Sequence, residues 1–156
     1  MHQTIADLLA AHPIFAGVAP ADLSLIAGCG RNAAFREGEY LFREGTQADQ
    51  FFVVREGRVA IEIFVPDRGG LVVDTVEPGD IVGVSWIFPP YRWEFDGRCV
   101  AAVRAVSLDG ACLRGKCDAD PRLGYELMKR FARVLHRRIE SAQLRLLDLY
   151  GTPGGR

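Results

Sequence analysis

The chain has 156 residues, of which 49% are hydrophobic and 25% charged, and its formal net charge is −1. This length and composition are typical of one globular domain with a core of its own and exclude a disordered chain. No apolar run approaches the roughly 18 residues of a membrane span, and the N-terminus lacks the basic region of a secretory signal, so we expect a cytoplasmic protein with no membrane partner.

Two short helices are predicted at the N-terminus. The first covers residues 4–11, where Thr4 and Asp7 form a capping-box pattern, and Pro13 lies beyond its end. The second begins near Pro20, because proline suits the first turn of a helix. Its inner face and its end are marked by Leu23, Ile26, Ala27, Gly28 and Gly30.

Residues 31–114 predict a barrel of short strands. Apolar runs alternate there with glycine-marked turns, and residues 58–65 show the period of two of a half-buried strand. Residues 66–70 read as a hairpin loop. We therefore predict an α+β protein, with a β-roll or jelly-roll barrel of about eight antiparallel strands between short N-terminal helices and a long C-terminal helix.

The four cysteines are Cys29, Cys99, Cys112 and Cys117. They contain no C-x-x-C pair, and zinc or iron–sulfur sites usually show tighter, repeated spacing. In a cytoplasmic protein they are expected to be reduced. The sequence therefore predicts buried, inert thiols and no metal site.

A long C-terminal helix is predicted over residues 120–150. Asp120 can cap it and Pro121 fits its first position. At about 1.5 Å per residue this helix would be about 45 Å long. The domain is expected to span residues 1–150, with a flexible tail at 151–156.

Part of this helix is expected to form the seam of a homodimer. Its apolar residues recur at heptad spacing, and a small barrel cannot cover so long a stripe. The residues are Met128, Leu135, Ala142 and Leu149, with Phe131, Ile139 and Leu146 at the alternate positions. The alternatives are a helix lying along the barrel, or docking on a protein partner.

Positive charge is concentrated in the C-terminal part of the chain. Residues 114–156 carry 10 Lys/Arg against 5 Asp/Glu, whereas residues 1–113 carry 9 against 15. Arginines distributed along a helix are most often a solvated face or a surface for an acidic partner. Only six residues follow Tyr150, too few for a helix-turn-helix, so no sequence-specific DNA binding is expected.

An ordered set of glycines carries the most specific signal. It reads Gly38-Glu39-x-Leu41-Phe42-x-x-Gly45, then Ala48-Asp49-x-Phe51-Phe52-Val53-Val54-x-x-Gly57-x-Val59, then Pro78-Gly79-Asp80-Ile81-Val82-Gly83. This pattern resembles the cyclic-nucleotide-binding domain of the Crp/Fnr and protein-kinase-A regulatory class, over roughly residues 5–148. The resemblance implies a regulatory module, and it leaves cAMP or another small anionic nucleotide open as the ligand.

The resemblance also implies a phosphate-binding cassette after Gly83. In that family a short helix follows this glycine, and its N–H groups and a downstream Arg hold the cyclic phosphate. A Glu directly after the glycine holds the ribose. Here that position is Val84, which accepts no hydrogen bond. Arg98 is one residue out of step, with Cys99 at the family's Arg position, unless a bulge near Gly97 restores the register.

The cassette is also longer than usual, with residues 89–93 inserted. Its aromatic residues Trp86, Tyr91 and Trp93 could stack on a base or fill the pocket. An anion is expected near the start of the helix after Gly83, with Arg98 as first anchor and Arg92 as second. The candidate ligand-binding residues are Gly83, Val84, Ser85, Trp86, Arg92, Arg98 and Cys99.

The sequence therefore predicts a non-enzymatic, nucleotide-sensing regulatory module with a degenerate cassette. The histidines lie outside the predicted strands, and no G-x-S-x-G is present, so neither a cupin-type metal site nor a serine hydrolase is indicated. The alternative is a ligand-free scaffold or accessory subunit. The cassette resembles single-domain members of the family, some of which are accessory subunits of cytosolic NAD(P)-linked nickel–iron hydrogenases. That keeps NADPH or a protein partner open, although no G-x-G-x-x-G is present.

Overall fold

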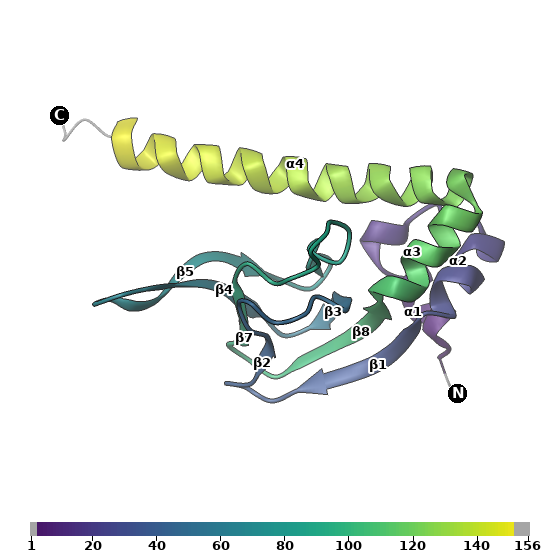
Figure 1. Ribbon diagram of the computed structural model, residues 1–156, viewed down its shortest axis with the longest axis horizontal. Coiled ribbons are helices and arrows are strands. Elements are labelled where there is room, and N and C mark those ends of the chain that lie inside the picture. The colour runs from purple at the N-terminus through teal and green to yellow at the C-terminus, as the bar shows by residue number, and fades with distance from the viewer. Residues whose placement is uncertain (1–2, 152–156) are drawn as a thin grey trace.

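A computed structural model describes residues 3–151 and shows a β-roll with a long helix lying across it (Figure 1). The helices are α1 (Ile5–Ala10), the 3-10 helix η1 (Pro13–Phe15), α2 (Pro20–Ala27), α3 (Gly110–Ala119) and α4 (Pro121–Gly151). The strands are β1 (Gly30–Phe35), β2 (Tyr40–Phe42), β3 (Gln50–Glu56), β4 (Val59–Val65), β5 (Gly69–Val76), β6 (Ile81–Val82), β7 (Asp96–Cys99) and β8 (Val103–Asp109). The predicted fold class is confirmed.

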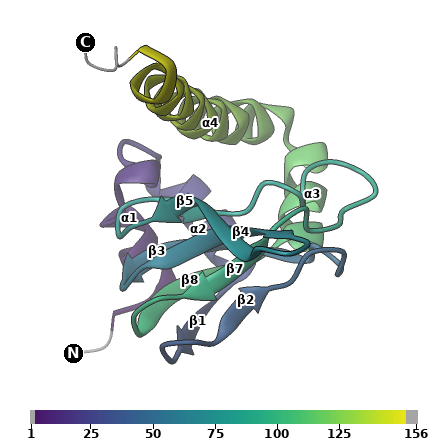
Figure 2. The same ribbon diagram turned by 90° about the vertical axis from the view of Figure 1, so that its left-hand side faces the viewer.

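The eight strands form two antiparallel sheets that face each other. One sheet has the order β1-β8-β3-β6 and the other β2-β7-β4-β5, so most neighbours in a sheet are distant in sequence. Figure 2 shows the two sheets closing into a roll, with α4 along one side. Helices α1, α2 and α3 gather at the end of the roll where α4 begins (Figure 1).

The local signals at the helix starts behave as the sequence predicts. The Thr4 hydroxyl accepts a hydrogen bond from the Asp7 amide, and the Asp7 carboxylate accepts one from the Thr4 amide, which is a complete capping box. Pro20 occupies the first turn of α2. Of the tail expected at residues 151–156, Gly151 is the last residue of α4 and the others lie outside the described residues.

The last strand ends before the barrel boundary expected near residue 114. Strand β8 ends at Asp109, and the ten-residue helix α3 begins at once, capped by the Asp109 carboxylate, which accepts a hydrogen bond from the Cys112 amide. Gly110 and Gly115 weaken the local preference for a helix. Leu113 is the one buried apolar side chain of α3. Tertiary packing, rather than sequence period, therefore determines this element.

The prediction of four reduced cysteines is wrong. Cys29 and Cys112 form a disulfide, although 83 residues separate them. The register of β1 on β8, which pairs Gly30 with Leu108, brings Cys29 to the start of α3. Burial raises the pKa of the free thiol of Cys99 to about 11 and also raises that of Cys117.

Two clusters of apolar side chains form the core. The first joins the N-terminal helices and α4 to one sheet, and at its centre Trp86 stacks on Phe51 with Phe131 edge-on to both. The second fills the inside of the roll around Phe42, Trp93 and Cys99. Phe131, expected on a dimer seam, is only 2% exposed and belongs to the first cluster.

Only the first half of α4 is anchored in the core. The buried side chains of this half are Leu123, Leu127, Phe131 and Val134. The side chains from Ile139 to Tyr150 are exposed. The hairpin of β4 and β5 lies beneath this second half (Figure 1). No helix among the described residues has both the length and the apolar character needed to cross a membrane.

His12 ties η1 to the roll as a neutral ring. It is 6% exposed; its Nδ1 accepts a hydrogen bond from the Ile14 amide, and its Nε2 lies 3.0 Å from the Val54 carbonyl oxygen. Both contacts are satisfied when Nε2 carries the single proton. Burial lowers the pKa of His12, although the Val54 carbonyl and the Asp80 carboxylate oppose this effect.

This ring makes folding stability depend on pH. The unfolded histidine binds a proton below about pH 6.5 while the buried ring stays neutral, so the stabilisation is complete above that pH and is lost as the pH falls toward the lowered folded pKa. The loss can reach about 1.4 kcal/mol per pH unit. Urea unfolding at pH 7.5 and 5.5 is expected to show a steeper decline for the wild type than for His12→Gln. A matching His136→Gln variant, altered at an exposed ring, is expected to follow the wild type; equal slopes for all three would contradict the assignment.

Candidate functional site

A cavity of about 320 Å³ lies between the mouth of the roll and α4. Its walls are mostly apolar side chains of the roll, and its cover is one face of α4. From the roll it is lined by Phe42, Ile61, Val73, Asp74, Val82, Gly83, Val84, Ser85, Trp93, Glu94 and Phe95, and from α4 by Leu135, Arg138, Ala142 and Arg145. Three of the seven candidate residues, Gly83, Val84 and Ser85, therefore line it.

No helix forms after Gly83, so the helix expected there is absent. The chain makes a turn in which the Ile87 amide donates to the Val84 carbonyl, and a second turn in which the Tyr91 amide donates to the Phe88 carbonyl. Gly83 has a φ of +107°, and a Cβ at this position would lie 2.6 Å from the ring of Trp93. This glycine is therefore required both by the backbone and by the close approach of an aromatic ring, and there is no row of helical N–H groups to receive a phosphate.

Trp93 is packed into the roll. It is 6% exposed and stacks on Phe42, with 3.8 Å between ring centroids and 10° between the planes. Phe42 in turn lies on Gly97, where a Cβ would come within 2.5 Å of its ring. Gly97 on β7 and Gly83 just after β6 thus make room for one aromatic pair, which takes up the inside of the roll beside the cavity.

The side chains of β7 alternate, and this places Arg98 outside the roll. Gly97 and Cys99 face the interior, where Cys99 is fully buried in the second cluster. Arg98 points the other way, and its Nε and Nη2 donate to Oε2 of Glu62 at 3.1 and 2.7 Å. The hydrogen bond from Arg98 and the charges of the pair raise the pKa of the guanidinium. The register irregularity next to β7 lies on β2, between Tyr40 and Phe42, and leaves Arg98 outward.

The remaining candidates also lie away from the cavity. Trp86 is 1% exposed and belongs to the first core cluster. Arg92 donates to the Gly45 carbonyl at 3.0 Å on the exposed edge of the roll. The guanidinium of Arg114 lies over the Tyr91 ring, with 4.0 Å between its central carbon and the ring centroid. The inserted residues therefore hold the loop against the roll and α3.

Two cavity residues that the sequence did not single out come from α4. Arg138 pairs with Asp80 at 3.2 Å and donates to the Ile81 carbonyl. Arg145 donates to the Val73 carbonyl at 2.8 Å and lies 3.9 Å from the Asp74 carboxylate. Leu135, Arg138, Ala142 and Arg145 follow steps of three and four, so their common face could have been found from helical spacing.

The cavity can accept a small ligand with an apolar body and an anionic group. Its walls supply dispersion contacts, and its two guanidiniums are the cations that a phosphate or carboxylate would meet. Within residues 3–151, no cluster of three or more histidine, cysteine or acidic side chains is arranged to hold a metal ion.

The sequence and the fold both match known proteins. Residues 33–120 match the family described as the cyclic nucleotide-binding domain. A "CRP-like cAMP-activated global transcriptional regulator" of Mycobacterium tuberculosis (strain CDC 1551 / Oshkosh) is 30% identical over 146 residues, covering 94% of this chain and 63% of the relative. The chain thus spans less than two thirds of that regulator.

Solved structures show the same fold. A putative cyclic nucleotide-binding protein from Geobacter metallireducens GS-15 has a TM-score of 0.76 and 30% identity, covering 86% of this chain and 97% of its own. The regulatory domain of Toxoplasma gondii PKA, solved with cAMP, has a TM-score of 0.69 at 18% identity, covering 85% and 49%. The chain belongs to the cyclic nucleotide-binding domain family.

Proposed function

We propose that this protein is a non-enzymatic regulatory module that senses a small ligand in the cavity beneath α4 and does not hold a cyclic phosphate in the usual way of its family. The observation that carries the proposal is the direction of Arg98, which is paired with Glu62 on the outside of the roll while Cys99 faces inward. The relatives named above, a cAMP-activated regulator and a kinase regulatory domain, support a regulatory role.

The interior of the roll lacks the polar groups that a cyclic nucleotide requires. Val84 stands where a ribose-binding carboxylate is expected, and the Phe42–Trp93 pair fills the space beside Gly83. Each missing charge-assisted hydrogen bond removes roughly 1.5–3 kcal/mol of binding free energy, or about 10- to 150-fold in affinity. We therefore expect cAMP and cGMP to bind weakly, and a nucleotide or other anion to bind through Arg138 and Arg145.

Helix α4 is the element that would report ligand binding. Beyond Val134 it is joined to the roll by Leu135 and by the contacts of Arg138 and Arg145, all of which border the cavity. A ligand that engages either guanidinium competes with Asp80 or Asp74 for it. Binding would therefore change how the second half of α4 lies on the roll.

A ligand-free scaffold is the second candidate. It is favoured by the filled roll and by the exposed apolar side chains of the second half of α4, among them Ile139, Leu146 and Leu149 at 57%, 53% and 71% exposure. We propose that these three side chains form the seam of a homodimer, with docking on another protein as the alternative. No feature of residues 3–151 selects a hydrogenase as that partner.

Calorimetric titration with cAMP, cGMP, NADH, NADPH and ATP tests the ligand proposal. Any anion that binds is expected to lose at least about tenfold in affinity in Arg138→Gln or Arg145→Gln, because each change removes a charge-assisted hydrogen bond. Val84→Glu improves the affinity for cAMP only if the missing carboxylate, and not the Phe42–Trp93 pair, is what weakens binding. The double variant Arg98→Gln/Glu62→Gln, which neutralises the outer pair together, is the control and should bind as the wild type does.

Two results would decide against parts of this proposal. Submicromolar binding of cAMP that is lost in Arg98→Gln/Glu62→Gln would show that Arg98 turns into the roll. Failure of every nucleotide to bind the wild type and Val84→Glu would favour the scaffold.

The seam is tested by light scattering coupled to size exclusion. The wild type is expected near twice 17.2 kDa, and Leu146→Asp is expected near the monomer mass, because a charge buried in an apolar interface is costly. Leu144→Asp is the matched control: it is also exposed, but at about 100° per residue it lies on the opposite side of the helix. A dimer that survives Leu146→Asp but not Leu144→Asp would place the interface elsewhere.

A further inference from the structure

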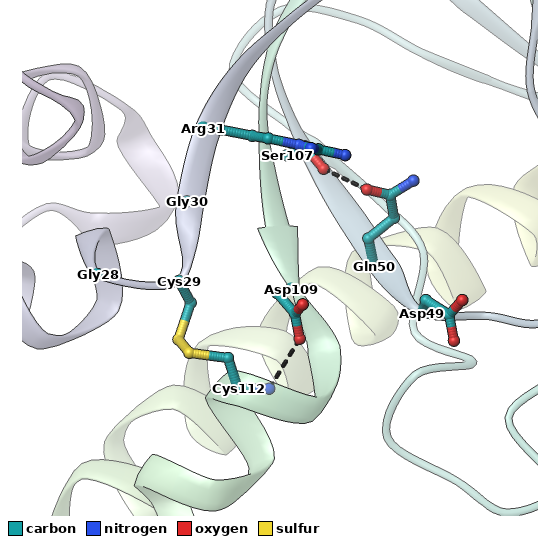
Figure 3. A pocket seen from close by; sticks show the side chains of 9 residues that line it. All are labelled: Gly28, Cys29, Gly30, Arg31, Asp49, Gln50, Ser107, Asp109 and Cys112. Atoms are coloured by element: carbon teal, nitrogen blue, oxygen red, sulfur yellow. Dashed lines mark hydrogen bonds between the residues drawn. A yellow bond between two sulfur atoms is a disulfide. The ribbon is translucent and has the colours of Figure 1, made fainter.

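The Cys29–Cys112 disulfide borders an open pocket of about 440 Å³ at the start of α3 (Figure 3). The end of α2, the start of β1 and the start of α3 form one side of this pocket. The other side carries Asp49, Gln50 and Ser107, where the Ser107 hydroxyl donates to the Gln50 amide oxygen. Both cystine sulfurs thus belong to residues that line a solvent-accessible hollow.

The two cysteines differ in access. Cys29 is 8% exposed and packs in the first core cluster, whereas Cys112 is half-buried. The backbone N–H of Cys112, in the first turn of α3, is already bound to the Asp109 carboxylate, so access is what distinguishes the two sulfurs. A nucleophile that enters the pocket therefore reaches the sulfur of Cys112 more readily than that of Cys29.

The pocket is lined by one cation, Arg31, and by two carboxylates, Asp49 and Asp109, the second of which accepts a hydrogen bond from the Cys112 amide. Arg31 and Asp49 are both exposed, and neither forms an ion pair with another described residue. In Figure 3 the Arg31 side chain reaches from β1 across Ser107 toward Gln50, the residue that follows Asp49. This arrangement suits a small molecule that carries both a carboxylate and an ammonium group.

We propose that this pocket is a thiol–disulfide exchange site for a low-molecular-weight zwitterionic thiol. Arg31 binds its carboxylate and Asp49 its ammonium group, which brings its sulfur to the cystine.

The exchange takes place in two steps. A thiolate attacks Sγ of Cys112, the bond between Cys112 and Cys29 breaks, and Cys29 leaves as a thiolate that takes a proton from water. A second thiolate then attacks the sulfur of the thiol bound to Cys112 and releases Cys112, which is protonated in turn. Two molecules of thiol are oxidised to one disulfide, and the cystine is reduced to two cysteines; the low-molecular-weight disulfide reverses both steps.

Helix α3 connects this site to the cassette. Two residues after Cys112, the guanidinium of Arg114 donates to the Trp86 carbonyl and lies over the Tyr91 ring. A Cβ at Gly110 would come within 2.8 Å of Cβ of Trp86, so the start of α3 is in close contact with the cassette. Breaking the disulfide removes the covalent link between α3 and the residue before β1, and we expect this to loosen the contacts of α3 with the loop that contains Val84 and Trp93.

The first test measures reduction rates of the oxidised wild-type protein by mass spectrometry after alkylation. At equal thiolate concentration, glutathione is expected to reduce the cystine faster than 2-mercaptoethanol, which has no charged groups. Arg31→Ala and Asp49→Asn should each slow the reduction by glutathione about twofold to fivefold, which is the usual effect of an exposed ion pair. The rate of reduction by 2-mercaptoethanol should stay unchanged. Arg36→Ala, another exposed arginine without an ion pair, is the control. Equal effects of the variants on both thiols, or no Cys29–Cys112 peptide in the oxidised protein, would overturn the proposal.

The second test asks whether reduction reaches the cassette while the fold persists. In Trp93→Phe, Trp86 is the remaining tryptophan, and its quenching by acrylamide is expected to increase on reduction and to return with oxidised glutathione, at constant far-ultraviolet circular dichroism. The same reversible change in total tryptophan emission is expected in the wild type, so the test does not depend on the variant folding. Loss of circular dichroism on reduction, or no change in quenching, would show that the disulfide is only a structural link.

Discussion

The alternation of side chains along β7 decides what the roll can bind. Because successive residues of a strand face opposite sides, Cys99 and Arg98 cannot both point inward, and the register of β7 on β4 turns Cys99 toward the core. Arg98 then pairs with Glu62, a carboxylate that is 7% exposed and would be costly to leave alone. Reversing Arg98 would therefore break a half-buried ion pair as well as shift the strand.

The aromatic pair inside the roll follows from the same register. None of the arginines among residues 3–151 places its guanidinium inside the roll beside Gly97. Trp93 and Phe42 stack in the space between Gly83 and Gly97, and each ring lies where a Cβ would otherwise be. What remains open is the layer between the roll and α4. The two guanidinium groups that line this layer, those of Arg138 and Arg145, come from α4 and not from the strands.

The sequence predicted the elements whose signals are local. The capping box at Thr4, proline at the start of α2 and α4, and the glycine corners of the roll all act over a few residues, and the fold class was correct. Features that depend on tertiary pairing were missed. The Cys29–Cys112 bond arises from the register of β1 on β8, and α3 forms in spite of its two glycines.

The candidate site was predicted only in part. Gly83, Val84 and Ser85 line the cavity, and that they bind a ligand stays a prediction. Position in the chain could not determine which way Arg98 faces, since one residue of register exchanges the two sides of a strand. Arg138 and Arg145 are not predicted as cavity residues, because the sequence favours a dimer seam for the apolar residues of α4 and a solvated face for its arginines.

Strand β7 itself is the place to test this account. A crystal structure of the protein grown in a large excess of cAMP is predicted to keep the Arg98 guanidinium on Glu62 and the Trp93 ring on Phe42, with no nucleotide inside the roll. A cyclic phosphate bound between Gly83 and an inward-turned Arg98, with Trp93 displaced, would contradict it.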